Sequence, residues 1–413
     1  MSAFVNALHV LTGQFKMSLF YSLILLYTTA MYLPLTTKNV AHANPTQNST
    51  QNSTRNSTLQ ILILGGNGFI GSSLAAKLLS IESYNVTILN RGRYYFDSKS
   101  RIDPYVRRMV CDRSDIYNCT ELVNSTQYYD AVVDYSSYYM EDMQNILHVL
   151  RARFGRYIYI SSDSVYEVCI KTPHGGPSRE EDAIRPRDPR ERHELNMADY
   201  YGHQKLACED VLQNERNLNG INYVSLRLPD VIGPRDTTNR FWDYHIWLLT
   251  HQLDGSFGPV HLNPRENKLI SLVYSEDLSD LIIKLLEVEL YNVYNEAYNV
   301  AFEPVTLEGF IGIMGESLGV DVVFNRTDQA NVHWYPSVTR GPVNTTKISE
   351  KLNWKPSPFN VAVKSSCEFF RGAMSVPEFE KRRDGILKRY LPNNDARETF
   401  LKDELNRVSR EEL

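Results

Sequence analysis

The chain has 413 residues, of which 42% are hydrophobic and 23% charged, a mixture typical of a folded globular protein and not of a polytopic membrane protein. Forty-four Lys and Arg against 49 Asp and Glu residues give a net charge of −5, which argues against nucleic acid as the principal partner. The five cysteines are too few for a disulfide scaffold and lack C-x-x-C spacing, so no metal site is expected.

An apolar stretch occupies residues 17–35, after Lys16 and upstream of Ala41-His42-Ala43. A basic start, an apolar middle and an A-x-A site are typical of a secretory signal peptide, so we expect residues 1–43 to be removed. The stretch is also long enough to span a bilayer, and an uncleaved signal anchor is the alternative. Pro34 favours cleavage because proline weakens a spanning helix.

Both flanks of the folded body carry signals for the secretory pathway. Residues 44–59 form a low-complexity tract whose N-x-S/T triplets predict a glycosylated, flexible spacer; they begin at Asn48, Asn52 and Asn56. The last four residues, Arg410-Glu411-Glu412-Leu413, are similar to a K-D-E-L retrieval signal. Together these features predict the endoplasmic reticulum lumen as the location and the retrieval receptor as a partner. In that oxidising space Cys111 and Cys119 either pair across a short loop or stay reduced.

Apolar runs alternate with helical stretches through residues 60–235, which predicts a parallel sheet with helices on both faces. The fold class is therefore α/β, a Rossmann-type doubly wound parallel sheet with a smaller C-terminal substrate domain. We assign residues 60–235 to the sheet domain, 236–375 mainly to the substrate domain and 376–413 to a helical tail. Strands are expected at 60–64, 85–89, 131–133, 157–160 and 223–228, and helices at 72–79, 140–154 and 197–213.

A glycine-rich turn, Gly65-Gly66-Asn67-Gly68-Phe69-Ile70-Gly71, follows the first expected strand and opens the first helix. Its glycines let backbone N–H groups reach a pyrophosphate at the positive end of the helix. After the second strand, Arg91 and Arg93 stand where an acidic residue would bind an unphosphorylated ribose, so NADP is favoured over NAD. Two solvated loop arginines are the alternative. The predicted cofactor-binding residues are Gly65, Gly68, Phe69, Ile70, Gly71, Arg91, Arg93, Asp112, Tyr201 and Lys205.

Three side chains form the predicted catalytic group: Ser162, Tyr201 and Lys205. Tyr201 and Lys205 are four residues apart in an expected helix and share one of its faces. A lysine beside a phenol lowers the pKa of the phenol and makes it a proton donor and acceptor near neutrality. Ser162 ends the preceding strand, where it can face the crevice and hydrogen-bond the reacting oxygen. A Y-x-x-x-K pair also occurs on exposed helices, but its order after the glycine turn and the serine strand disfavours chance.

With these motifs the chain resembles the extended short-chain dehydrogenase/reductase family, in its NAD-dependent epimerase/dehydratase branch. The matching segments are GGNGFIG, SSDSVY, YGHQK and LRLPDVIGPRD, and the resemblance covers about residues 60–372. It implies that Tyr201 moves the proton, that Lys205 tunes Tyr201 and holds the nicotinamide ribose, and that Ser162 steadies the substrate oxygen. It also implies a homodimer formed through two sheet-flanking helices.

Three further residues are expected to contact the substrate: Asp163, Asp230 and Arg235. Dehydratases of this family resemble T-D-E at the serine strand; here Asp163 matches the acid, but Ser164 replaces the glutamate, which disfavours elimination of water. Asp230 stands where relatives usually place a substrate-binding asparagine, and a carboxylate would repel a diphosphate.

The function we expect is that of an NAD(P)-dependent oxidoreductase or epimerase-like enzyme acting on a carbonyl or secondary alcohol of a small molecule, such as a sugar derivative. One alternative is a nucleotide-sugar epimerase or dehydratase. Another is a non-catalytic cofactor-binding or scaffold module of the same fold, which the intact set of Ser162, Tyr201 and Lys205 disfavours.

Overall fold

The structure is a computed structural model, and it describes residues 58–411 except 173, 255–258, 264–267, 290–291, 328–334 and 336. The predicted signal peptide, all but the last two residues of the predicted spacer, and the final two residues of the predicted retrieval signal lie outside the described residues. Within the described part, no helix combines the length and the apolar character needed to cross a membrane.

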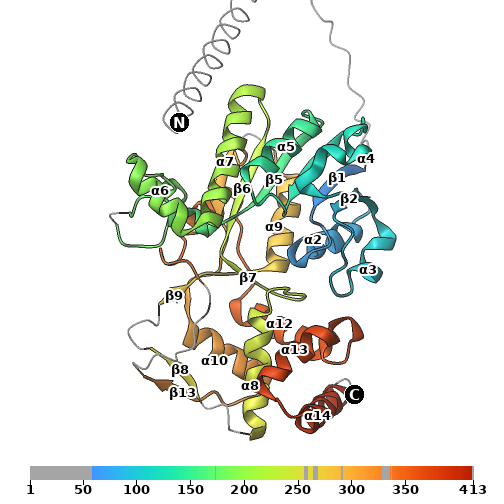
Figure 1. The fold of residues 1–413 in the computed structure, drawn as a ribbon, viewed down its shortest axis with the longest axis vertical. Coiled ribbons are helices and arrows are strands. Elements are labelled where there is room, and N and C mark those ends of the chain that lie inside the picture. Colours follow the sequence, from blue (N-terminus) through green and yellow to red (C-terminus); the bar gives the residue numbers. More distant parts are fainter. Residues whose placement is uncertain are drawn as a thin grey trace, which may run out of the picture. The chain divides into compact units, whose positions relative to one another are not determined.

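A seven-stranded sheet forms the centre of the larger lobe (Figure 1). Its order is β3-β2-β1-β4-β5-β6-β11, and all neighbouring strands run parallel. The chain order reverses between β1 and β4, and such a reversal opens a crevice at the carboxyl ends of the two strands. The strands are β1 (Leu59–Leu64), β2 (Tyr84–Asn90), β3 (Arg107–Val110), β4 (Tyr129–Asp134), β5 (Phe154–Ser162), β6 (Tyr223–Leu228) and β11 (Glu296–Asn299).

Helices cover both faces of this sheet, as the predicted fold class requires. Successive strand residues point to opposite faces. Ile61 and Ile63 therefore pack in one core with α2 and α9, while Leu62 and Leu64 pack in another with α5 and α7. The helices of this lobe are α2 (Phe69–Leu79), α3 (Ser98–Arg101), α4 (Thr120–Val123), α5 (Met140–Leu150), α6 (Pro189–Ala198), α7 (Tyr200–Asn219), α9 (Ser275–Glu287) and α11 (Thr346–Leu352).

All three predicted helices have different bounds in the structure. The helix expected at 72–79 begins three residues earlier, as α2 (Phe69–Leu79). The helix expected at 140–154 ends at Leu150, because Arg151 and Ala152 adopt φ angles of 49° and 57°, in the left-handed region that stops a helix. The helix expected at 197–213 is two helices, α6 and α7, separated at Asp199. The Asp199 carboxylate accepts a hydrogen bond of 2.7 Å from the Gly202 N–H and so caps the start of α7.

The predicted division at residue 236 needs a correction, because the chain returns to the larger lobe after that point. Strand β11 adds to the edge of the main sheet beside β6, and Leu278 and Leu285 of α9 are buried in the core on one sheet face. Residues 236–375 thus supply one strand and two helices, α9 and α11, to the sheet lobe. Periodicity predicts that a segment is a strand but not which neighbour it joins.

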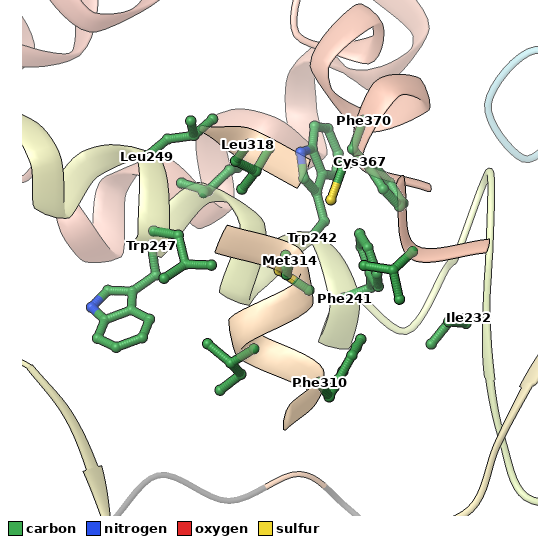
Figure 2. Close-up of a cluster of buried hydrophobic side chains, with 14 of the residues drawn as sticks. Ile232, Phe241, Trp242, Trp247, Leu249, Phe310, Met314, Leu318, Cys367 and Phe370 are labelled. Carbon is green, nitrogen blue, oxygen red and sulfur yellow. The ribbon is translucent and has the colours of Figure 1, made fainter. Parts of the chain in front are cut away.

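The smaller lobe packs around aromatic side chains, as Figure 2 shows. Trp242 of α8 is fully buried and stacks on Phe370 of α12 with ring centroids 5.1 Å apart. Phe400 of the predicted helical tail joins the same core. The helices of this lobe are α8 (Arg240–Asp254), α10 (Leu307–Leu318), α12 (Phe359–Ala373), α13 (Glu380–Tyr390) and α14 (Asn394–Glu411). Short strand pairs join β7 (Asp230–Ile232) to β10 (Leu272–Tyr274), β9 (Leu269–Ile270) to β12 (Val305–Thr306), and β8 (Val260–Leu262) to β13 (Phe324–Arg326).

Candidate active site

A cavity of about 940 Å³ lies at the carboxyl edge of the main sheet. Its walls come from the turns after β1, β2, β3, β4 and β5, from the start of α7, and from segments 228–240 and 337–339. Arg235 is the one predicted site residue that does not line it. Those that do are Gly65, Gly68, Phe69, Ile70, Gly71, Arg91, Arg93, Asp112, Ser162, Asp163, Tyr201, Lys205 and Asp230.

The glycine-rich turn brings the N-terminus of α2 against β1. Gly65 has a φ of 85°, which suits glycine, and a Cβ placed on Gly71 would lie 2.5 Å from the Gly65 carbonyl oxygen. Gly68 occupies the N-cap position and offers no side chain to the first turn of α2. The backbone N–H groups of that turn are therefore left for an anionic group, and the cradle fits the pyrophosphate of a dinucleotide.

Arg91 and Arg93 are exposed at the rim of the cavity, in the loop after β2. They lie near Asp112, whose pKa is lowered mainly by hydrogen bonds from Ser114 and further by the two guanidinium groups. The Asn67 side-chain amide donates to the Arg93 carbonyl oxygen and ties this loop to the glycine turn. The two arginines thus lie at the rim of the cavity, in a loop that is hydrogen-bonded to the glycine turn.

A disulfide closes the loop that carries Asp112. It joins Cys111, which lines the cavity, to Cys119, so the structure contains the paired alternative for these cysteines. The remaining thiols of the chain, Cys169, Cys208 and Cys367, are buried.

Tyr201 and Ser162 both line the cavity. Ser162 ends β5 and is 8% exposed; its hydroxyl accepts a hydrogen bond of 3.2 Å from the Ser164 N–H, and its presence opposes the rise in the pKa of Tyr201. Gly202 makes close packing possible here, because a Cβ at that position would lie 2.1 Å from the Ser164 carbonyl oxygen. Gly202 directly follows Tyr201 in the sequence, and this glycine is a signal from which the close packing could have been predicted.

Lys205 lies one turn further along α7 and is 3% exposed. Its Nζ donates to the carbonyl oxygens of Ser137, at 3.1 Å, and Ile160, at 2.6 Å. It also lies 4.5 Å from the ring centroid of Tyr159 and 5.9 Å from that of Tyr201. An ammonium group has three donors, so one remains for a ligand hydroxyl.

The expected effect of Lys205 on the phenol is corrected by the structure. Burial raises the pKa of Tyr201, the nearby Tyr138 adds to the rise, and the Ser162 hydrogen bond opposes it. Tyr201 has 45% of its surface exposed and lines the cavity, and Lys205 is not among the main groups that shift its pKa. Burial also lowers the pKa of Lys205 to about 8. The phenol is therefore protonated at neutral pH and set to donate a proton.

Of the three predicted substrate residues, Asp163 and Asp230 line the cavity and Arg235 does not. Asp163 is 5% exposed and lines the cavity, and burial raises the pKa of its carboxyl group well above the usual value. Asp230 also lines the cavity and forms an ion pair with Arg240. Arg235 does not line the cavity; its Nε and Nη2 atoms donate to the Asp97 carboxylate at 2.5–2.9 Å. Arg240, five residues further on, lines the cavity instead.

A buried polar network, which was not predicted from the sequence, lies beside the cavity wall that includes Arg113. Arg113 donates to both carboxylate oxygens of Asp134, at 3.2 Å and 2.8 Å, and the Tyr157 hydroxyl donates to the same carboxylate at 2.5 Å. Asp134 ends β4 and has no exposed surface. A carboxylate at the end of a buried strand was the available signal, since a buried charge needs a partner.

The sequence of the chain also matches the model of a known protein family. Residues 61–301 match the model described as the NAD dependent epimerase/dehydratase family. A search of curated proteins found no match.

Solved structures share the fold. UDP-glucose 4-epimerase of Thermotoga maritima is 19% identical, with a TM-score of 0.56 over 77% of this chain and 100% of that one. UDP-glucuronic acid 4-epimerase of Bacillus cereus, solved with UDP-glucuronic acid and NAD, is 18% identical, with a TM-score of 0.57 over 76% and 99% of the two chains. dTDP-glucose 4,6-dehydratase of Bacillus anthracis, solved with NAD, is 16% identical, with a TM-score of 0.56 over 76% and 97%.

Proposed function

The chain belongs to the NAD dependent epimerase/dehydratase family, and from this premise we propose that it is a nicotinamide-dependent oxidoreductase or epimerase-like enzyme. Its substrate on this proposal is a small molecule with a carbonyl or secondary alcohol, such as a sugar derivative. The observation that carries the proposal is the meeting of Ser162, Tyr201 and Lys205 in the cavity that the glycine cradle also lines.

Each residue of the catalytic group has a role that follows from its contacts. In the reducing direction Tyr201 donates its hydroxyl proton to the substrate oxygen as hydride reaches the carbon, and in the oxidising direction its phenolate takes the proton from the substrate hydroxyl. Ser162 steadies that oxygen, because its hydroxyl lies beside Tyr201. Lys205 uses its remaining donor to orient a ribose hydroxyl. A bound nicotinamide dinucleotide supplies or accepts the hydride, and the first turn of α2 holds its pyrophosphate.

We further propose that the cofactor is NADP(H), because Arg91 and Arg93 are exposed at the rim beside the cradle. The double variant Arg91→Ser/Arg93→Ser is expected to bind NADPH about 10-fold to 100-fold more weakly, since charge-assisted hydrogen bonds contribute about 1.5–3 kcal/mol. NADH affinity should change by less than about three-fold, because NADH lacks the 2′-phosphate. Calorimetric titration of both dinucleotides measures this. Equal losses for the two, or tighter binding of NADH by the unaltered protein, would show that NAD(H) is the cofactor.

A nucleotide-sugar epimerase is the second candidate, and the specific observation in its favour is the fold shared with such enzymes. Stabilisation by UDP-glucose separates it from the leading proposal. The non-catalytic module is less well supported, since a binding role needs no buried lysine beside a tyrosine and a serine.

For the location we propose the lumen of the endoplasmic reticulum. The tandem acceptors at Asn48, Asn52 and Asn56 and the Cys111–Cys119 disulfide support it, since disulfides persist in oxidising compartments. Digestion of the protein from its native cells with peptide N-glycosidase is expected to increase its gel mobility by the mass of several glycans. Unchanged mobility together with free thiols at Cys111 and Cys119 would place the protein elsewhere.

A further inference from the structure

The end of the cavity beyond Tyr201 is lined by acidic residues. Asp163 is buried there, Asp230 is half-buried, and Glu167 and Asp199 complete the set. Among the described residues that line this end, Lys205 and Arg240 carry the positive charges. Lys205 faces two backbone carbonyl oxygens. Arg240 is therefore the cation that remains for a substrate.

Arg240 is already held by a carboxylate. Its Nη1 forms a short ion pair with Asp230, whose side chain is 14% exposed against 40% for the arginine. The other two acids are also engaged: Glu167 accepts hydrogen bonds from Thr339, at 2.6 Å, and from the Arg340 N–H, at 3.0 Å, while Asp199 caps α7. A diphosphate entering this end would meet a carboxylate and an arginine that the carboxylate already neutralises.

We propose that the Asp230–Arg240 ion pair is a specificity filter, which rejects nucleoside diphosphate sugars and leaves the cavity selective for an uncharged, hydroxyl-rich sugar. This inference rests on the proposed function, because it names the substrate class of the same site. Asp230 is then a specificity-determining residue.

The remaining lining suits such a substrate. Hydroxyl groups both donate and accept, as a sugar requires. They come from Ser164, Thr237 and Ser337, while the Thr238 and Thr339 hydroxyls, which donate to Asp236 and Glu167, can still accept. The Asp163 carboxyl, whose pKa is raised by burial and by the nearby Asp230, is a further hydrogen-bonding group at this end. An uncharged polyol finds partners at this end without needing a cation.

The filter should weaken in acid. Burial raises the pKa of Asp230 to about 6; Arg240 opposes the rise and Asp236 adds to it. The other charged or titratable groups that face it are Asp163 and Tyr335. Below this pKa the carboxyl takes up a proton and loses its charge, which leaves Arg240 able to bind phosphate. Diphosphate binding should therefore strengthen as the pH falls through about 6.

The test is calorimetric titration of UDP-glucose into the full chain saturated with its dinucleotide, which blocks binding at the cofactor cradle. At about pH 7.5, Asp230→Asn is expected to bind UDP-glucose about 10-fold or more tightly than the unaltered protein, since a like charge is removed and a cation is released. The double variant Asp230→Asn/Arg240→Gln should lose this gain. Glu181→Gln removes an exposed carboxylate outside the cavity and should have no effect.

The pH arm needs no variant. UDP-glucose binding to the unaltered protein should strengthen between about pH 7.5 and pH 5.5, and the affinity of Asp230→Asn should stay level. Three results would overturn the filter: tight UDP-glucose binding by the unaltered protein at pH 7.5, no gain in Asp230→Asn, or faster turnover of UDP-glucose than of uncharged sugars. Dinucleotide binding is measured on the same samples, so its absence would instead count against the proposed function.

Discussion

Replacing Tyr201 by Phe is expected to lower kcat by about 10²-fold to 10⁴-fold, the usual contribution of a positioned proton donor. The ring remains to fill its place on α7, and dinucleotide affinity should stay within about three-fold because Lys205 and the glycine cradle are intact. The loss should fall on kcat, since the hydroxyl acts on the reacting oxygen. Turnover of the best sugar substrate, followed by dinucleotide absorbance, gives the rate, and calorimetry gives the affinity.

Tyr200→Phe is the matched control for this variant. Tyr200 adjoins Tyr201, is exposed, does not line the cavity, and its hydroxyl accepts a hydrogen bond of 3.0 Å from Gln204. Its removal should leave kcat within a factor of about two, as for a surface hydrogen bond. Unchanged turnover in Tyr201→Phe, or equal losses in the two variants, would remove Tyr201 from the catalytic group.

Replacing Arg227 by Met is expected to lower the free energy of unfolding by about 3–5 kcal/mol, because it leaves a buried carboxylate without its partner. Arg227 of β6 is 5% exposed, and its Nη2 lies 2.7 Å from the Glu209 carboxylate of α7. Its Nη1 donates to the Tyr166 hydroxyl at 3.1 Å and to the Glu180 carbonyl oxygen at 2.9 Å. Urea unfolding, followed by circular dichroism, measures the loss.

Two comparisons identify the cause of that loss. Arg227→Met/Glu209→Leu removes both charges and should lose less stability than the single variant. Arg107→Met breaks an exposed pair with Glu121 and should cost less than about 1 kcal/mol. If Arg227→Met cost no more than Arg107→Met, the buried pair would not be a major source of stability.

The same pair contacts the strand end that carries the proposed catalytic serine, Ser162. The Ser161 hydroxyl donates to Glu209 at 2.6 Å, and Ser161 directly precedes Ser162 at the end of β5. The Glu209 carboxylate of α7 thus contacts both the end of β5, through Ser161, and β6, through Arg227. Loss of Glu209 should therefore displace Ser162 as well as weaken the fold.

Much of the sheet lobe could be predicted because its signals are local. The apolar run at 223–228 is β6 residue for residue, and the glycine motif at 65–71 follows β1 and runs into the first turn of α2, which begins at Phe69. The return of β11 to the edge of this sheet was not predicted, since the pairing of β11 with β6 depends on contacts between distant segments.

At the site, residue positions were easier to predict than their chemistry. Helical spacing brought Tyr201 and Lys205 to one face, but the pKa of the phenol depends on burial, which the spacing does not report. Arg235 and Arg240 follow the same strand, and only the folded structure shows that Arg235 pairs with Asp97 while Arg240 lines the cavity.

Dinucleotide binding by the full chain tests the central claim most directly. The account predicts binding of one NADPH or NADH per chain, seen by calorimetry and by native mass spectrometry. Gly71→Val should abolish it, since even a Cβ at this position would lie 2.5 Å from the Gly65 carbonyl oxygen. Failure of the unaltered protein to bind any nicotinamide dinucleotide would contradict the account and leave a shared fold without the enzyme's chemistry.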